Sequence, residues 1–123
     1  MEIISTNNAP QAVGPYSQAI LVNGTLYASG QIAIDPETQK MVENDIVAQT
    51  ERICKNIEGV LKAAGMGFEN VVKTTCFLAD MADFGTFNGI YEKYFISKPA
   101  RSCVAAKALP KNALAEIEII AVK

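Results

Sequence analysis

The 123-residue sequence contains no histidine, and this absence excludes several kinds of active site. Histidine is the usual acid–base group at neutral pH and a frequent metal ligand. Ser-His-Asp and Cys-His hydrolases, zinc sites with histidine ligands and histidine-based ribonuclease chemistry are therefore ruled out. The sequence also lacks any basic run, and 11 Lys and Arg against 13 Asp and Glu give a net charge of −2. This balance argues against a nucleic-acid partner, because binding to phosphates depends on clustered cations.

No segment is long and apolar enough to span a bilayer, and the first residues lack the pattern of a signal peptide. We therefore expect a cytoplasmic protein with no membrane partner. The three cysteines, Cys54, Cys76 and Cys103, include no Cys-x-x-Cys pair and fit neither a disulfide framework nor a cysteine-only zinc site. We expect reduced thiols and no metal. The length indicates a single domain over residues 1–123.

Asn23-Gly24 lies between two apolar-rich runs within residues 16–29, and this pattern predicts a two-residue β-hairpin. With Asn23-Gly24 as the turn, Ile20 faces Tyr27 across the two strands. A short extended piece over residues 31–34 follows and ends in the turn residues of 35–38.

Apolar spacing predicts an amphipathic helix over Asp45–Ala64, with Asn44 or Asp45 as its N-cap and Gly65 as its end. The same periodicity predicts a strand over Val71–Ala79 and a second, shorter helix over Asp80–Phe95. It predicts two further strands over Ala100–Ala106 and Glu116–Val122. In the first of these strands Val72, Thr74 and Cys76 are expected to share a side. The order of elements predicts an α+β fold, a single mixed β-sheet with two helices packed on one face.

The other face of this sheet needs an occupant. It would carry five apolar residues, Ile20, Tyr27, Phe77, Ile120 and Val122. A face this apolar is unstable in water. We therefore expect an oligomer that assembles through the open face of the sheet.

Arg101 is the strongest candidate for a functional side chain. The strand period of two puts Arg101 and Cys103 on one side, and Val104, taken as core, on the other. Arg101 would then point away from the helices, onto the same open face as Glu116 and Glu118. The spacing favours an ion pair of Arg101 with one of these glutamates, and the alternative is a guanidinium that grips the carboxylate of a small organic acid.

Each of the other candidate site residues has a functional and a structural interpretation. Only Arg101 could lower the pKa of the Cys103 thiol, so Cys103 is interpreted as a packed residue that contributes its backbone. Tyr16 could line a pocket or pack at an interface. Gly30, after Ser29, permits either close approach of a ligand or a bulge. Asn88, on the second helix, stays undecided.

Several motifs in the same order make the chain resemble one family nearly end to end. They are Gly14-Pro15-Tyr16-Ser17-Gln18-Ala19, Ser29-Gly30-Gln31-Ile32, Val72-Lys73-Thr74-Thr75-Cys76-Phe77-Leu78, Pro99-Ala100-Arg101-Ser102-Cys103-Val104, and Leu109-Pro110-Lys111 followed by Glu116-Ile117-Glu118. Together they resemble the RidA (YjgF) family of enamine/imine deaminases. The resemblance favours the ligand site over the ion pair at Arg101.

The resemblance implies a chorismate mutase-like fold and a homotrimer with active sites between subunits. It implies hydrolysis of 2-imino acids, such as 2-iminobutanoate and 2-iminopropanoate, to 2-oxo acids and ammonia, without a cofactor. The implied catalytic residues are Arg101, as carboxylate anchor, and Glu116, which positions or activates water. The implied substrate-binding residues are Tyr16, Ser29, Gly30, Asn88 and Cys103. The partners implied are small 2-imino or 2-oxo carboxylic acids.

Two other functions are weighed against the deaminase. A trimer that binds 2-oxo acids as a metabolite sensor would need no carboxylate beside an anionic ligand, so Glu116 disfavours it. An RNA-cleaving translation inhibitor is disfavoured by the acidic net charge and the absence of histidine. The linker Ile96–Lys98 is shorter than the connection in many members of the family, which affects the expected substrate range more than the reaction class.

Overall fold

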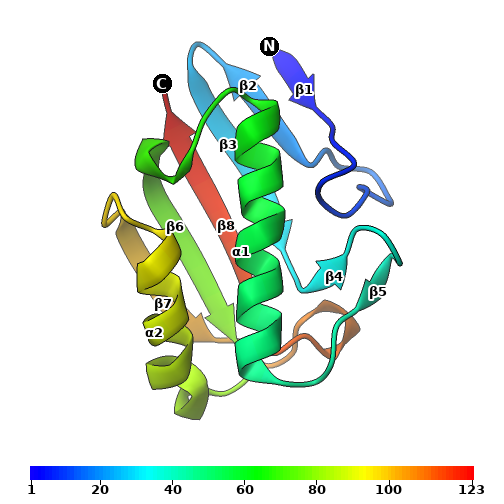
Figure 1. The fold of residues 1–123 in the computed structure, drawn as a ribbon, viewed down its shortest axis with the longest axis vertical. Helices are drawn as coiled ribbons and strands as arrows, with labels where there is room; N and C mark the ends of the chain where they lie inside the picture. Colours follow the sequence, from blue (N-terminus) through cyan, green and yellow to red (C-terminus); the bar gives the residue numbers. More distant parts are fainter.

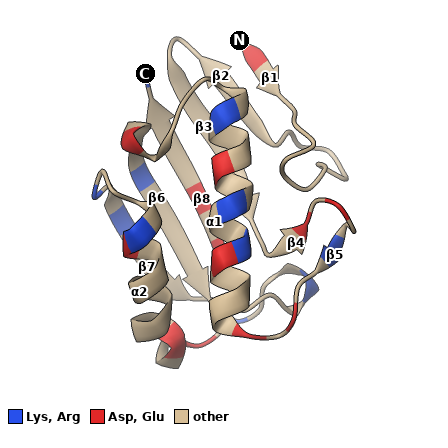
Figure 2. Ribbon diagram, viewed as in Figure 1, with Lys and Arg blue, Asp and Glu red and all other residues tan.

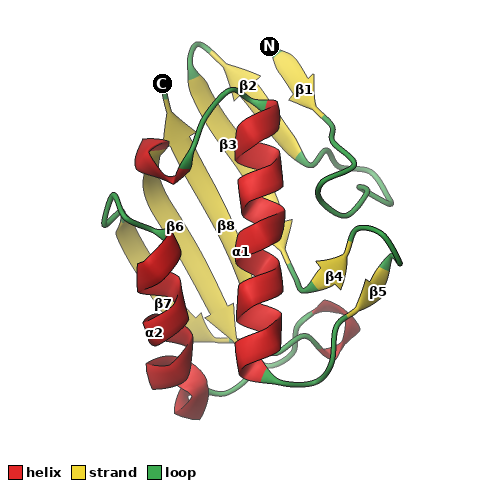
Figure 3. Ribbon diagram, in the orientation of Figure 1, coloured by secondary structure: helices red, strands yellow, loops and turns green.

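Six strands form one twisted sheet, and two helices lie across one of its faces in a computed structural model that describes all residues 1–123 (Figures 1 and 3). In spatial order the strands are β1 (Glu2–Ile4), β2 (Ala19–Val22), β3 (Thr25–Gln31), β8 (Ala115–Val122), β6 (Val71–Leu78) and β7 (Ala100–Ala105). Neighbouring strands are antiparallel except β6 and β7, which are parallel. The predicted mixed sheet with two helices on one face is confirmed.

The hairpin of β2 and β3 has the predicted register, with Ile20 opposite Tyr27. Its turn residues Asn23 and Gly24 both have positive φ, 51° and 78°. Asn and Gly adopt this left-handed region at little cost, which is why the dipeptide sets the register.

Helix α1 (Ile46–Ala63) has the ends that the sequence predicts. The Asp45 side chain caps it by accepting a 2.8 Å hydrogen bond from the Ala48 amide. The chain leaves the helix through Gly65, whose φ of +72° suits glycine. The helix buries Ile53, Ile57 and Leu61 against the sheet, and these side chains form part of a core of 22 buried residues.

Helix α2 (Phe84–Tyr94) is shorter than the predicted segment, because its first turn is a separate 3₁₀ turn over Met81–Asp83. Phe87, Tyr91 and Phe95 on one side of this segment are buried. Tyr91 and Phe95 stack with ring centres 4.2 Å apart. The aromatic stripe is thus core, and its Tyr91 ring also lies beside the site described below.

Three features of the sheet were not predicted. Strand β1 pairs with β2, and a small separate hairpin joins β4 (Ile34–Asp35) to β5 (Lys40–Met41). The expectation that Val72 shares a side with Thr74 is wrong, because the register shifts between residues 71 and 73. Val71 is consequently buried, whereas Val72 is 48% exposed on the other face.

The sheet face without helices carries the five apolar residues expected there, alongside Glu116 and Glu118. Tyr27 and Val122 are exposed on it, and Ile20, Phe77 and Ile120 are half-buried. Neither helix is both long and apolar enough to cross a bilayer.

Candidate active site

Arg101 lies on the side of the sheet that the helices cover, so the expectation that it points away from them is wrong. In the parallel pair of β6 and β7, Arg101 is level with Thr74 and Cys103 with Cys76. Residues at the same level of neighbouring strands point the same way, and Thr74 and Cys76 are fully buried beneath the helices. Val104, taken as core, is instead 49% exposed on the open face because β7 is the edge strand.

Helix α2 holds the guanidinium of Arg101 in place. Its Nη1 donates a 2.6 Å hydrogen bond to Oδ1 of Asn88. Its central carbon lies 4.8 Å from the Tyr91 ring centre and 5.4 Å from that of Phe84. Such contacts with ring faces stabilise a cation without neutralising its charge.

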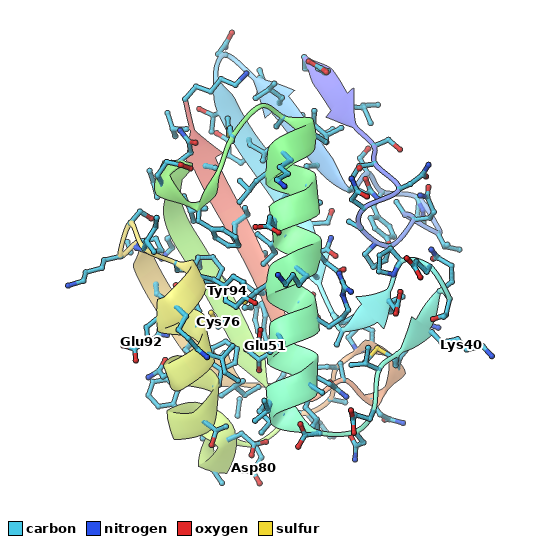
Figure 4. All side chains as sticks on the ribbon, viewed as in Figure 1. Lys40, Glu51, Cys76, Asp80, Glu92 and Tyr94 are labelled. Atoms are coloured by element: carbon cyan, nitrogen blue, oxygen red, sulfur yellow. The ribbon has the colours of Figure 1, made fainter.

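The predicted ion pair of Arg101 with Glu116 or Glu118 is wrong. The only ion pair in the structure joins Lys93 and Glu51, 3.9 Å apart, between the two helices. Glu51 also accepts a 2.5 Å hydrogen bond from the Tyr94 hydroxyl, and Figure 4 shows both residues between α1 and α2. Arg101 therefore keeps its positive charge free for a ligand.

The free side of Arg101 faces a depression of about 1040 Å³ between α2 and the edge of β7. Asn88, Tyr91 and Phe84 line it, and so do Pro99 and residues of the short linker before it. An arginine with an unpaired charge in such a depression is suited to bind a planar carboxylate through two parallel hydrogen bonds.

Glu116 lies on the opposite face of the sheet from Arg101, so the expectation that the two share one face is also wrong. Glu116 is level with Phe77 of β6, and the next residue, Ile117, is fully buried under the helices. Strand β6 separates β8, which carries Glu116, from β7, which carries Arg101. One copy of the chain therefore does not bring the two predicted catalytic residues together.

Glu116 lines its own cavity of about 930 Å³, together with Tyr16, Ser29, Gly30 and Lys111. Its side chain lies against Gly30, where a Cβ atom would overlap the carboxylate oxygen and lie 2.9 Å from Cδ. Burial raises the pKa of the Glu116 carboxyl, and the nearby charge of Glu118 raises it further. A carboxylate with a raised pKa is a better general base than an ordinary one.

The hydroxyl of Ser29 is occupied within the chain. Ser29 Oγ donates a 2.6 Å hydrogen bond to the carbonyl oxygen of Ser17, next to Tyr16. Tyr16 itself is 55% exposed at the rim of the Glu116 cavity. Ser29 thus holds the backbone that carries Tyr16, and Tyr16 is free to contact a ligand or another copy of the chain.

All three cysteines are free thiols, and none is activated. Burial raises the pKa of Cys103, and the Arg101 charge offsets this only in part. Burial likewise raises the pKa of Cys76, to about 12, and Cys54 is fully buried. Protonated thiols are poor nucleophiles, which agrees with the interpretation of Cys103 as a packed residue.

The sequence analysis did not identify the two aromatic rings beside Arg101 or the lysine in the Glu116 cavity as parts of the site. Helical spacing marks Phe84 and Tyr91 as members of an apolar stripe, but it does not show what lies at the edge of that stripe. Lys111 belonged to a recognised motif, and it lines the Glu116 cavity with a left-handed φ of 54°.

The fold and its arginine define a class, the small α+β domains that present a guanidinium without an ion-pair partner beside a surface depression. Residues 6–123 match the family described as Endoribonuclease L-PSP. The chain is 50% identical to the 2-iminobutanoate/2-iminopropanoate deaminase of Mus musculus, over 99% of this chain and 91% of the mouse protein.

Solved structures of related proteins have the same fold over the whole length of this chain. RidA from an Antarctic Psychrobacter species is 40% identical with a TM-score of 0.95, covering all of both chains. Escherichia coli TdcF, solved with bound serine, is 36% identical with a TM-score of 0.95, covering 100% of this chain and 99% of TdcF. The chain belongs to the RidA/YjgF family.

Proposed function

We propose that the protein is a hydrolase that converts small 2-imino acids, such as 2-iminobutanoate and 2-iminopropanoate, into 2-oxo acids and ammonia. The observation that carries this proposal is the Arg101 guanidinium, which Asn88 orients and no acidic side chain neutralises. Sequence similarity supports this reaction, since mammalian relatives about 50% identical to this chain are named 2-iminobutanoate/2-iminopropanoate deaminase.

Hydrolysis of a 2-imino acid mainly requires that the substrate and a water molecule be positioned correctly. A protonated imine carbon is already electrophilic, so the enzyme has to hold the substrate carboxylate on Arg101 and present a water molecule. Glu116 would accept a proton from that water as the water oxygen bonds to the imine carbon, which gives a carbinolamine. Glu116 would then return this proton to the amine nitrogen. The carbon–nitrogen bond breaks with release of ammonia, the carbonyl forms and the hydroxyl proton passes to solvent, so that one water is consumed per ammonia released. Orientation of this kind lowers a barrier by several kcal/mol without a metal.

The active site would form between copies of the chain in a homotrimer. Arg101 and Glu116 lie on opposite faces of one sheet, so a site that uses both must take them from two copies. The apolar open face supplies the contact surface that an assembly needs. A cyclic trimer would thus place the Arg101 depression of each copy beside the Glu116 cavity of the next.

The other predicted residues have roles in one half of this site or the other. Asn88 and Cys103 belong to the Arg101 half, where Asn88 orients the guanidinium and Cys103 contributes backbone groups. Tyr16, Ser29 and Gly30 belong to the Glu116 half, where Gly30 leaves room for the carboxylate.

The charge distribution does not favour RNA cleavage, although the family model is described as an endoribonuclease. Figure 2 shows basic and acidic residues interspersed along α1. With no histidine in the chain, the site also lacks the usual acid–base group for such chemistry.

The test is enzymatic. An amino acid oxidase generates the imine in the presence of the purified protein, and ammonia release is measured above the spontaneous rate. Arg101→Ala should abolish the acceleration. Arg52→Ala is the matched control, because the other arginine of the chain also bonds an asparagine, with Nε 3.1 Å from Asn56 Oδ1, but on α1. No acceleration by the wild-type protein, or equal losses in the two variants, would overturn the proposal.

A further inference from the structure

The side chain of Gln18 is buried and holds a loop that has no helix or strand of its own. Gln18 is 3% exposed. Its Oε1 accepts a 2.7 Å hydrogen bond from the Thr6 amide, and its Nε2 donates to the carbonyl oxygens of Thr6 at 3.0 Å and Pro10 at 2.8 Å. A longer contact of 3.4 Å reaches the carbonyl of Ala9. One amide therefore ties both ends of the segment 6–10.

This loop depends on side chains for its shape. Between β1 and β2 the only backbone hydrogen bond within the segment runs from the Tyr16 amide to the Gly14 carbonyl, at 2.9 Å. The loop also rests on α1, where Asn8 lies so close to Gly59 that a Cβ would lie 2.9 Å from the Asn8 carbonyl carbon. Buried backbone groups need hydrogen-bond partners, and at the inner side of the loop Gln18 supplies them.

The same loop forms one wall of the Glu116 cavity. Pro10, Gln11 and Val13 line that cavity, and Gln18 lines it as well. Val13 is 82% exposed, and the side chain of Gln11 donates hydrogen bonds only to Thr6 and Asn7 of the same loop. The position of the wall is therefore set from its inner end, where the Gln18 amide lies.

We propose that Gln18 is a positioning residue of the deaminase, which keeps the loop 6–13 in place as the wall of the Glu116 cavity. This inference rests on the proposed function. The wall limits the access of water to Glu116 and bounds the space for the substrate side chain. Loosening it should weaken substrate binding and admit water to the carboxylate.

The protonation of Glu116 gives this role a specific readout. Burial raises the pKa of Glu116, so a more hydrated cavity should bring that pKa down toward its ordinary value. The charged groups nearby are Lys111, in the same cavity, and Glu118, on the same strand. Replacement of Gln18 by the uncharged methionine leaves both of them in place and adds no charge, so a change in the pH profile of that variant would report hydration.

The variants Gln18→Met and Gln18→Glu separate hydrogen bonding from packing. Methionine keeps the approximate length without any hydrogen bond, and glutamate keeps the acceptor for Thr6 but loses the donors to the carbonyls. We expect kcat/KM to fall about ten- to hundredfold, mostly through KM, as for a group displaced by about 1 Å. In Gln18→Met, which adds no charge to the Glu116 cavity, we also expect the acidic limb of the kcat/KM profile to move to lower pH.

Asn70→Ala is the matched control. The Asn70 amide also ties two backbone segments, accepting from Gly67 at 2.9 Å and donating to Val122 at 3.0 Å, but it lines neither cavity of the site. It should leave KM and the pH profile unchanged. Gln18 variants that are folded and active with wild-type KM and an unmoved acidic limb would overturn the inference.

Hydrogen exchange on the wild-type protein tests the same idea without a substitution. Saturating 2-oxobutanoate should slow exchange of the amides in residues 6–13, because a ligand in the cavity would rest on their wall. Unchanged exchange in this segment, with binding shown by calorimetry, would contradict the inference. A wild-type protein that binds the 2-oxo acid but releases no ammonia would refute the proposed reaction. It would not contradict the inference that Gln18 positions the loop 6–13 as a wall of the cavity.

Discussion

A single methyl group at Gly30 is expected to displace the Glu116 carboxylate. In Gly30→Ala the new Cβ would lie 2.9 Å from Cδ of Glu116 and 3.1 Å from its Cγ. Carbon atoms in ordinary contact are about 3.5–4.0 Å apart, so the side chain has to move by roughly 1 Å. The backbone of Gly30 does not have the positive φ that would strain an alanine, so the cost falls on Glu116.

The effect should appear in catalysis and not in stability. Misplacement of a reacting group by about 1 Å costs on the order of 100-fold in rate. We expect kcat/KM in the ammonia-release assay to fall by about that factor, which corresponds to about 2.7 kcal/mol. The melting temperature should stay close to that of the wild type, because a glycine-to-alanine change also restricts the unfolded chain.

Gly67→Ala is a close control. There the new Cβ would also overlap a glutamate oxygen, that of Glu69, and lie 2.9 Å from its Cδ, but Glu69 lies outside both cavities of the site. This variant should keep full activity. In a double-mutant cycle, Glu116→Gln should cost much less in the Gly30→Ala background than in the wild type. A wild-type kcat/KM in Gly30→Ala would refute the idea that the small size of Gly30 sets the position of the Glu116 carboxylate. Fully additive effects of the two substitutions in the cycle would refute it as well.

Three further substitutions test other parts of the site. Glu118→Gln should move the acidic limb of the kcat/KM profile to lower pH, because the Glu118 charge raises the pKa of Glu116 and its removal lets Glu116 stay ionised in more acidic solution. Tyr91→Phe should lose about 1–3 kcal/mol in chemical denaturation, since it breaks the buried 2.7 Å bond to Thr74, yet keep KM because the ring beside Arg101 remains. Cys103→Ala should keep most of the ammonia release, and loss of turnover on this change would contradict the protonated, unreactive thiol.

The elements that carry their own local signals were predictable from sequence. Asn23-Gly24 fixes the register of β2 and β3 because both residues take positive φ cheaply. Asp45 and Gly65 mark the ends of α1 because each satisfies a need of the helix terminus. Such signals act within a few residues and need no knowledge of the sheet order.

The face on which Arg101 lies was not predictable in the same way. The strand period shows that Arg101 and Cys103 share a side, but not which side the helices cover. Val104 suggested the wrong answer because it is apolar, and only the place of β7 at the edge of the sheet explains its exposure. The register shift near Val71 is a comparable case, since one extra residue in a strand exchanges the two faces.

Because Arg101 and Glu116 lie on opposite faces of the sheet, the proposed site depends on assembly of several copies of the chain. The motifs around both residues indicate the chemistry proposed for each half. They carry no information on which halves would meet in the proposed trimer, because that would depend on how copies of the chain pack on the open face. The sequence therefore indicated the reaction more directly than the geometry that performs it.

A refolding experiment with two inactive variants tests the central claim most directly. Arg101→Ala and Glu116→Gln chains are mixed in equal amounts, unfolded together and refolded, and the ammonia-release rate is compared with that of each variant refolded alone. If each site takes Arg101 from one copy and Glu116 from the next in a cyclic trimer, about one quarter of the sites should be intact and the mixture should regain about one quarter of wild-type activity. Recovery no greater than that of the separate variants would contradict a site shared between copies.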